Sequence, residues 1–171
     1  MRAVFRNCRL IGRRFRLAHV HFGREIIEVA TYRGMRDDTD DSEDNQDHQT
    51  EGGMILRDNV YGSLEEDALR RDFTINTLAI RLDPHRFGQL LDFYEGERDL
   101  HAGVIRVLHS LSFIEDPTRI FRAIRFEQRF HFRIGNFTLN QIKNAVKKEL
   151  VQKLSGRRIY NELLVIFNEP N

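Results

Sequence analysis

The sequence predicts an α/β region over residues 1–110, followed by an all-α region over residues 111–171. Two observations predict this division. The first region contains short runs of alternating or β-branched residues, which are separated by turn residues. From residue 116 onward, apolar residues recur at helical spacing in longer runs. The length of 171 residues suits one domain, or one domain and the start of a second.

Residues 9–33 predict a β-hairpin, because Leu17, His19 and His21 alternate with apolar residues and the run 25–32 is β-branched. Apolar residues occur on both faces of these strands, so we expect a sheet that is covered on both sides. Residues 34–53 are almost entirely polar or glycine and predict a flexible loop.

That loop contains Asp38 and Asp40, which have the spacing of a metal-binding Asp-x-Asp pair. Catalytic metal ligands need a rigid support, and this segment offers none. We therefore interpret both residues as solvated acids.

Ser63 and Glu66 have the spacing of a capping box and predict a helix that runs to about Ala79, with a break near Asp72 and Phe73. Thr138 and Gln141 predict a second capping box. Further strands are predicted at residues 78–82, 89–94 and 103–108, with turns at 83–84 and 95–96 between them, and helices at 116–130, 138–150 and 156–168.

Charged residues are segregated along the chain although the net charge is only +1. Arginines are concentrated in residues 2–16 and 119–133, and acids in residues 37–51. This pattern favours a surface that faces a polyanion, and scattered solvated charge is the alternative. Cys8 is the only cysteine, which suits a reducing, cytoplasmic environment. No apolar run is long enough to span a bilayer, so we expect no membrane partner.

Four arginines form a stripe on the predicted helix 116–130. Arg119, Arg122, Arg125 and Arg129 fall within a sector of about 120°, whereas Ile120, Phe121, Ala123 and Ile124 point toward a core. Neighbouring guanidinium groups repel one another unless anions face them. Either phosphate groups or internal acids such as Glu115 and Glu127 fit this requirement.

Asp116 precedes Pro117 at the start of this helix and suits an N-cap. Asp116 and Arg119 also share one helix face. A carboxylate accepts a hydrogen bond from an exocyclic amine and an arginine donates to a ring acceptor, so together they can read one edge of a nucleobase.

Arg70, Arg71 and Asp72 lie at the end of the helix predicted from residue 63. Either the helix dipole explains the two cations, or they hold phosphate while Asp72 accepts from a ribose hydroxyl. Asn76, one turn further on, both donates and accepts. Glu28 lies within an apolar strand, where a carboxylate needs a partner. It either pairs with an arginine such as Arg14 or Arg33, or lies beside a metal pair.

Two motifs carry a resemblance to a known family: RRDFTIN at residues 70–76 and EDPTRIFRAIRF at residues 115–126. They resemble the class II nucleotidyltransferases, which are the bacterial poly(A) polymerases and the tRNA CCA- or A-adding enzymes. Residues 5–20, 25–31 and 53–63 look like the poly(A) polymerase branch. The segments HSLSFIED at 109–116 and LSGRR at 154–158 look closer to the tRNA branch. This mixture leaves messenger RNA and tRNA open as substrates.

The resemblance implies a partial nucleotidyltransferase head with a mixed sheet over residues 1–110 and a helical neck over residues 111–171. The family's Gly-Gly-x-x-Arg-Asp and Asp-x-Asp segments are expected upstream of Met1, so the chain resembles a family member truncated at both ends. Arg71 and Asp72 would contact the triphosphate and ribose, and Glu28 would lie beside the missing metal pair. Glu115, Asp116 and Arg119 would select the incoming base, with support from Arg122, Arg125 and Arg158.

The reaction implied by the resemblance transfers AMP from ATP to an RNA 3′-hydroxyl with the help of Mg²⁺. Because the main metal ligands are expected outside the chain, we expect the chain alone to be inactive. Its implied partners are ATP and an RNA 3′ end, and a separate upstream head fragment is left open as a third. Two alternatives remain: a fragment of a tRNA CCA- or A-adding enzyme, and a non-catalytic nucleotide- or RNA-binding module.

Overall fold

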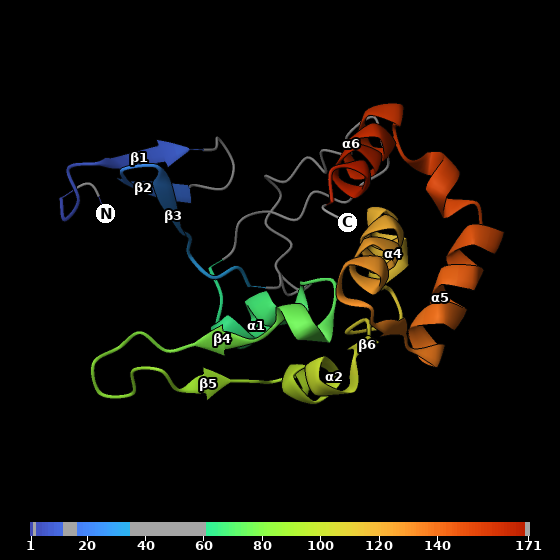
Figure 1. Cartoon of the computed structure of the whole chain (residues 1–171), viewed down its shortest axis with the longest axis horizontal. Coiled ribbons are helices and arrows are strands. Elements are labelled where there is room, and N and C mark those ends of the chain that lie inside the picture. Colours follow the sequence, from blue (N-terminus) through green and yellow to red (C-terminus); the bar gives the residue numbers. More distant parts are fainter. Residues whose placement is uncertain (2, 12–16, 35–60, 170–171) are drawn as a thin grey trace, which may run out of the picture. The chain divides into compact units, whose positions relative to one another are not determined.

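The computed structural model describes residues 1, 3–11, 17–34 and 61–169 (Figure 1). These residues form two units, one within residues 1–34 and 61–67 and the other over residues 68–169. Almost all of the predicted loop 34–53, with Asp38 and Asp40, lies outside the described residues, as does Arg14. The boundary predicted near residue 110 does not coincide with this division and stays a prediction.

The first unit contains a three-stranded antiparallel sheet in the order β1 (Cys8–Ile11), β2 (Leu17–Phe22) and β3 (Glu25–Val29). The predicted hairpin is confirmed, with Ala18 opposite Val29 and Phe22 opposite Glu25. Gly23 occupies its turn with φ of 61°, a left-handed conformation that glycine adopts without steric cost. Strand β1 adds to the free edge of β2.

The two faces of this sheet differ in polarity. One face carries the apolar cluster Cys8, Ala18 and Val20. The other face carries Arg9 opposite His19, and His19 opposite Glu28. On β3, Ile26 is 49% exposed and Ile27 is 53% exposed. The expectation of a sheet covered on both sides is therefore wrong for the described residues, because polar side chains occupy the second face and β3 stays open to solvent.

The capping box predicted at Ser63 is confirmed. Glu66 Oε2 accepts from the backbone N–H of Ser63 at 2.6 Å, and Ser63 Oγ accepts from the backbone N–H of Glu66 at 3.2 Å. Helix α1 (Leu64–Leu69) follows and ends before Asp72. A 3₁₀ turn, η1 (Thr74–Asn76), comes next, so the predicted break in the helix is also confirmed.

The second unit carries small two-stranded sheets and most of the helices. Strands β4 (Ala79–Ile80) and β5 (Leu90–Leu91) pair antiparallel, and β6 (Val104–Ile105) pairs parallel with β7 (Arg133–Ile134). The three strands predicted here are confirmed, although each is short. The helical elements are α2 (Gly96–Ala102), α3 (Ser112–Glu115), α4 (Thr118–Phe130), α5 (Asn136–Lys147), the 3₁₀ turn η2 (Leu150–Lys153) and α6 (Gly156–Phe167).

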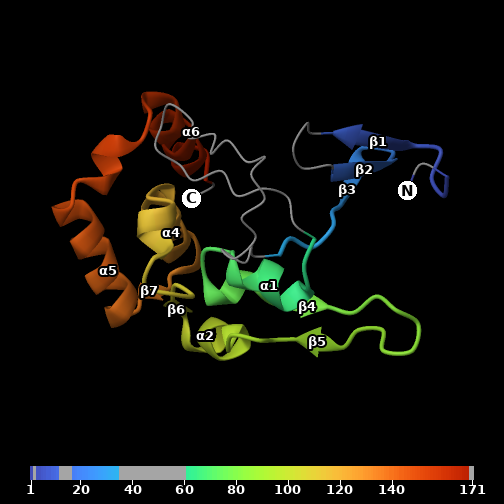
Figure 2. The ribbon, with the colours of Figure 1, turned by 180° about the vertical axis from the view of Figure 1, so that it is seen from behind.

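Helices α5 and α6 flank α4, as the two opposite views of the ribbon show (Figures 1 and 2). The three long helices lie close to their predicted bounds. Within the part of the chain that the structure describes, each helix is too short or too polar to cross a membrane.

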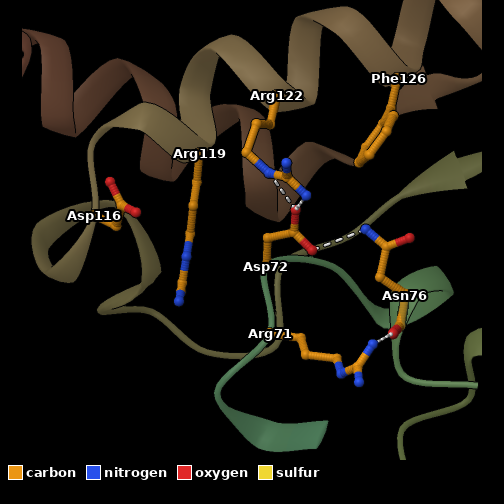
Figure 3. A pocket seen from close by; sticks show the side chains of 7 residues that line it. All are labelled: Arg71, Asp72, Asn76, Asp116, Arg119, Arg122 and Phe126. Carbon is orange, nitrogen blue, oxygen red and sulfur yellow. Dashed lines mark hydrogen bonds and ion pairs between the residues drawn. The ribbon is translucent and has the colours of Figure 1, made fainter. Parts of the chain in front are cut away.

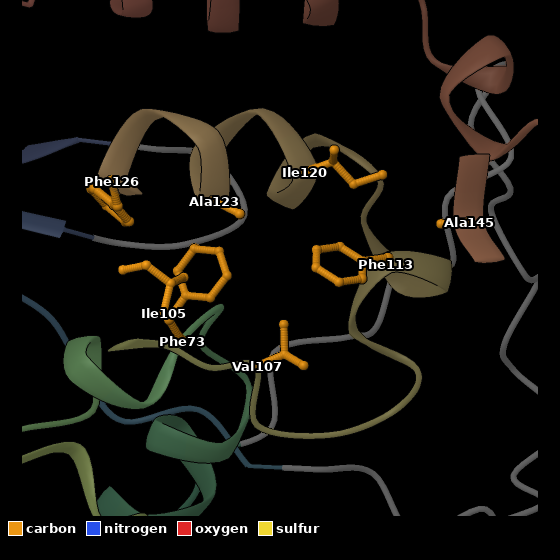
Figure 4. Close-up of a cluster of buried hydrophobic side chains, with 8 residues drawn as sticks. All are labelled: Phe73, Ile105, Val107, Phe113, Ile120, Ala123, Phe126 and Ala145. Carbon is orange, nitrogen blue, oxygen red and sulfur yellow. The ribbon is translucent and has the colours of Figure 1, made fainter. Parts of the chain in front are cut away.

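The core of the second unit lies beneath α4 (Figure 4). Phe73 is fully buried and meets Phe126 edge-on, with ring centroids 5.8 Å apart. From α4, Ile120 and Ala123 are buried as predicted, but Ile124 is 43% exposed, so its predicted core position is wrong. Because Phe73 directly follows Asp72, its burial fixes the backbone at that carboxylate.

Thr138 does not cap α5, because the helix already begins at Asn136. Its side chain is instead fully buried, and its hydroxyl accepts from the backbone N–H of Val107 at 3.1 Å. The predicted second capping box is therefore wrong. The hydroxyl satisfies a buried N–H next to β6 rather than the end of its own helix.

Replacing Thr138 by Val should lower the free energy of unfolding by about 1–3 kcal/mol, because the buried N–H of Val107 loses its acceptor. Replacement by Ser keeps the hydroxyl and should retain much of that stability. Urea unfolding followed by circular dichroism compares the two variants. A Val variant that is at least as stable as the Ser variant would contradict this, because it would show that packing of the methyl group outweighs the hydrogen bond.

Helix α2 was not predicted, because Glu95 and Gly96 were interpreted as a turn between strands. Glu95 does adopt a left-handed conformation with φ of 57°, but Gly96 begins a helix. A Cβ atom on Gly96 would overlap the carbonyl oxygen of Thr74, so only glycine fits. Asp92 Oδ1 accepts from the N–H of Gly96 at 2.9 Å, and Asp92 Oδ2 from the N–H of Glu97 at 3.0 Å. These bonds satisfy the start of α2 from outside the helix.

The pKa of Asp92 lies below its ordinary value. Partial burial acts to raise this pKa, but hydrogen bonds from the backbone N–H groups of Glu97, Gly96, Tyr94 and Glu95 together outweigh it. A lowered pKa means that the carboxylate stabilises the folded state above the unfolded pKa of about 4, and that this contribution is lost as the pH falls through the folded value. Asp92→Asn should therefore be destabilising at pH 7 and much less so near pH 2. An equal difference in unfolding free energy at both pH values would contradict this.

Candidate functional site

The second unit contains a cavity of about 430 Å³ beneath α4, a volume typical of small-molecule sites (Figure 3). The residues around it come from the segment that links α1 to η1, from the end of η1, and from α4 with the residues just before it. They are Arg71, Asp72, Asn76, Asp116, Arg119, Arg122 and Phe126. Six of them were predicted as nucleotide-binding residues, and the fold brings those six together.

Asp72 forms the floor of this cavity and is only 7% exposed. Its Oδ1 accepts from the backbone N–H of Phe73 at 2.9 Å and from Asn76 Nδ2 at 2.8 Å. Its Oδ2 accepts from Arg122 Nε at 2.7 Å and lies 2.5 Å from Arg122 Nη2. A carboxylate has about four acceptor sites, and here all are in use. Asp72 therefore holds Arg122 and Asn76 in fixed positions.

A buried ion pair between Asp99 and Arg106 holds the turn η1 in place. Asp99 on α2 is 1% exposed and accepts from Arg106 through both of its oxygens, at 2.9 Å each. Its Oδ2 also accepts from Thr74 Oγ1 at 2.7 Å, and the N–H of Thr74 donates to the carbonyl of Arg106 at 2.9 Å. Because Thr74 begins η1, this network sets the position of Asn76 at its end.

Asp116 directly precedes Pro117, which is the N-cap residue of α4, so the predicted N-cap is one residue off, but its carboxylate still accepts from the first N–H of the helix. Its Oδ1 accepts from the backbone N–H of Thr118 at 3.0 Å and from Thr118 Oγ1 at 2.6 Å. The same oxygen accepts from Arg158 Nη2 on α6 at 2.9 Å. These three contacts leave Oδ2 without a partner among the described residues. One oxygen thus orients the carboxylate while the other remains available to a ligand.

Arg119 crosses from α4 to the segment after α1. Its Nη2 donates to the carbonyl of Arg70 at 2.9 Å, and its Nη1 lies 3.5 Å from the carbonyl of Ser112 and 3.9 Å from Glu115 Oε2. Glu115 Oε2 also lies 3.7 Å from His109 Nε2. A guanidinium group has five N–H donors, so Arg119 keeps donors for a ligand while protein carbonyls hold it in place.

Arg70, Glu115 and Arg158 therefore contact residues of the cavity without lining it. Arg125 lies further along α4, where its Nη1 is 3.2 Å from Glu169 Oε1, and Arg129 shares that carboxylate at 3.4 Å. Internal acids thus do face the arginine stripe. Apart from Glu115 they are distant in the sequence, and Glu127 was the wrong candidate.

Phe126 was not among the predicted site residues, although it lines the cavity. The guanidinium carbons of Arg122 and Arg125 lie 5.3 and 4.9 Å from its ring centroid, which is the geometry of a cation–π contact. The available signal was the spacing of four residues between Arg122 and Phe126, which places both on one helix face.

Glu28 lies in the first unit and is not the buried carboxylate that was expected. Its side chain is 62% exposed, and its Oε1 lies 2.9 Å from His19 Nε2 on the neighbouring strand. No ion pair joins it to Arg33, and Arg14 lies outside the described residues. Those residues also contain no group of three His, Cys, Asp or Glu side chains that could hold a metal ion.

The cavity can bind an anion and read a flat polar group. Three arginines and two aspartates line it, and Asp72 is already neutralised by Arg122. The positive charge that remains suits phosphate oxygens. At the opposite end, Asp116 offers an acceptor and Arg119 offers donors, about one helical turn apart.

Comparison with known proteins gives three results. Residues 1–106 match the poly A polymerase head domain. The A-adding tRNA nucleotidyltransferase of Geobacter sulfurreducens is 59% identical over 107 residues, which cover 63% of this chain and 12% of that protein. Poly(A) polymerase I of Salmonella typhi is 42% identical over 173 residues, covering 100% of this chain and 36% of that protein.

Among solved structures, a complex of a CCA-adding enzyme with ATP superposes with a TM-score of 0.73 at 40% identity, covering 95% of this chain and 33% of that one. The chain thus spans 12%, 36% and 33% of the lengths of these three proteins. Both the sequence and the fold agree with the motifs at residues 70–76 and 115–126. The chain therefore belongs to the class II nucleotidyltransferase family, and its first 106 residues belong to the poly A polymerase head domain.

Proposed function

We propose that the cavity beneath α4 binds the incoming nucleotide of an RNA 3′-end adenylyltransferase. In the reaction of the whole protein, the RNA 3′-hydroxyl oxygen forms a bond to the α-phosphorus of ATP. The bond between the α-phosphorus and the bridging oxygen breaks, and pyrophosphate leaves. Mg²⁺ would supply charge neutralisation in such a reaction, and the residues of the cavity are assigned nucleotide binding and selection.

The observation that carries this proposal is the placement of Asp116 and Arg119 on one side of the cavity. Adenine presents an exocyclic amine, which donates, next to a ring nitrogen, which accepts. Asp116 Oδ2 complements the amine and the N–H groups of Arg119 complement the ring nitrogen. Guanine presents a carbonyl oxygen and a ring N–H at the same two positions, so it places an acceptor against the carboxylate and a donor against the guanidinium group.

The opposite side of the cavity suits the sugar and the phosphates. Arg71 supplies positive charge for the triphosphate, and Arg122, whose charge Asp72 balances, keeps guanidinium donors that Asp72 does not use. The four bonds that saturate Asp72 support a role in positioning Arg122 and Asn76. A ribose hydroxyl that donates to Asp72 would have to replace one of those bonds. Of the two side chains that contact Asp72, the amide of Asn76 costs less to exchange because, unlike Arg122, it is uncharged.

A second candidate is a tRNA A- or CCA-adding activity. The identity of 59% to an A-adding relative favours it, and cytosine presents the same amine and ring acceptor as adenine, so the same pair of side chains can accept CTP. A third candidate is a nucleotide- or RNA-binding module without catalysis, for which the cavity beneath α4 is itself sufficient.

Isothermal titration of ATP into the chain and into Asp116→Asn tests the proposed function. The variant keeps the size of the side chain but removes its charge and offers an amide donor, so we expect at least about a tenfold loss of affinity, or 1.4 kcal/mol. Arg133→Gln, an exposed arginine on β7 outside the cavity, should bind ATP normally. Unchanged affinity in Asp116→Asn would contradict the proposed base contact.

Incorporation of labelled AMP into a short RNA separates the candidates. Incorporation that Asp116→Asn abolishes would establish the chain as an active transferase. ATP binding without incorporation would favour a nucleotide-selecting module. Incorporation of CMP by the same protein would favour the CCA-adding activity.

A further inference from the structure

A second cavity, of about 490 Å³, lies in the first unit at the end of strands β1 and β2. Arg6, Asn7, Cys8, Arg9 and His21 line it. None of these residues takes part in the proposed nucleotide site. Two features set this cavity apart from an ordinary surface depression, namely its excess of positive charge and a buried polar atom without a partner.

The backbone around this cavity is fixed by a pair of hydrogen bonds. The N–H of His21 donates to the carbonyl of Asn7 at 3.1 Å, and Asn7 Nδ2 donates back to the carbonyl of His21. The register of β1 and β2 places Arg9 opposite His19. His21 lies two residues beyond His19 on β2 and therefore shares its face of the sheet. The strand pairing therefore holds Arg9 and His21 on one side of the sheet, and Arg6 lies on the segment that leads into β1.

The positive charge of the cavity is not balanced within the described residues. Arg6 and Arg9 form no ion pair with any of them, and no acid lines the cavity. The acid that shares this sheet face is Glu28, and it already contacts His19 at 2.9 Å. Two unpaired guanidinium groups beside one cavity favour an anionic occupant.

His21 Nε2 supplies an independent observation. This atom is buried and has no hydrogen-bond partner among the described residues. Buried polar atoms in folded proteins almost always have a partner, and an exception calls for an explanation such as a bound group. An imidazole nitrogen can donate to a phosphate oxygen, and the guanidinium groups of Arg6 and Arg9 can do so as paired forks.

We propose that this cavity is a binding site for a phosphate group, held by Arg6, Arg9 and His21. The fork of one arginine is enough to bind a planar carboxylate. A tetrahedral phosphate accepts hydrogen bonds from several directions at once, so it suits three donor side chains that come from different positions. The phosphate belongs either to an RNA backbone or to a free nucleotide. The site lies in the first unit and does not depend on the proposed function of the cavity beneath α4.

Nitrogen-detected NMR of the histidine side chains during titration with inorganic phosphate tests this proposal. We expect a saturable shift of the His21 Nε2 resonance. His109, which contacts Glu115 in the second unit, reports separately on that unit, so binding at the two cavities is distinguishable. Arg9→Gln and Arg6→Gln should each weaken the His21 response at least about tenfold, and Arg24→Gln, an exposed arginine in the β2–β3 turn, should leave it unchanged.

Two arms of the titration identify the source of the phosphate. A short oligoadenylate that shifts His21 at lower concentration than ATP does would assign the site to the RNA backbone, and the reverse order would assign it to a free nucleotide. No shift of His21 with any of the three ligands would overturn the proposal. So would a shift that Arg6→Gln and Arg9→Gln leave intact.

Discussion

Replacing Asp99 by Asn should lower the free energy of unfolding by about 3 kcal/mol, because it breaks a buried ion pair. Asp99 accepts three hydrogen bonds from Arg106 and Thr74 while 1% exposed. The Asn side chain replaces one acceptor oxygen of Asp99 by an NH₂ group, which then faces an N–H or O–H donor of Arg106 or Thr74. Arg106 is 44% exposed and recovers some hydration, which keeps the expected loss near the lower end of the range for buried pairs.

The matched control is Glu97→Gln on the same helix. Glu97 is 55% exposed and lies 3.8 Å from an exposed histidine, so its replacement should change stability by less than about 0.5 kcal/mol. Urea unfolding of the two variants gives both values. Because Thr74 starts the turn that carries Asn76, Asp99→Asn should also weaken ATP binding. A variant as stable as Glu97→Gln would contradict the anchoring role.

Replacing Asp72 by Asn should have the largest effect on the cavity beneath α4. An amide keeps only one acceptor oxygen, so it can no longer accept from both Arg122 and Asn76, and it removes the negative charge that balances Arg122. Since Arg122 is about one third exposed, we expect a loss of about 2 kcal/mol in stability, together with at least a tenfold weaker affinity for ATP, or about 1.4 kcal/mol.

A double-mutant cycle with Arg122→Gln isolates the pair. Residues joined by such an ion pair show coupling energies of roughly 0.5–3 kcal/mol, so the loss in the double variant should be smaller than the sum of the losses in the single variants. Strict additivity of the unfolding free energies would mean that Asp72 and Arg122 act independently, against the geometry of the site.

The sequence predicted those parts of the fold that depend on local pattern. The helices α4, α5 and α6 follow from apolar spacing, and the start of α1 follows from the capping pair Ser63 and Glu66. Helix α2 was missed because its start depends on Asp92, several residues upstream, and on the close approach of Gly96 to Thr74. Neither contact leaves a periodic signal.

The sequence predicted which residues form the candidate site but not which hydrogen bonds and ion pairs join them. Asp116 and Arg119 were placed on one helix face from their spacing, and both line the cavity. The bond from Arg122 to Asp72 joins residues 50 positions apart, and the bond from Arg119 to the carbonyl of Arg70 joins residues 49 apart. Such partners are set by the packing of α4 over Phe73, which a single sequence does not reveal.

The polarity of the first unit shows the same limit. Alternation predicted that His19, His21 and Glu28 lie in strands, but not which face a core would cover. The core of this unit contains Cys8, Ala18 and Val20, and the two histidines and Glu28 lie on the other face of the sheet. Because His21 lies on the face away from this core, it can line the cavity beside Arg6.

The most direct test of the account compares the equilibrium binding of ATP and GTP to the unmodified chain by calorimetry. If Asp116 and Arg119 read the base, ATP should bind at least about tenfold more tightly than GTP, because guanine reverses the donor and acceptor at the two contacted positions. The two nucleotides carry the same triphosphate and ribose, so charge alone cannot separate them. Equal affinities would contradict base selection by this pair and would leave the cavity as a phosphate site only.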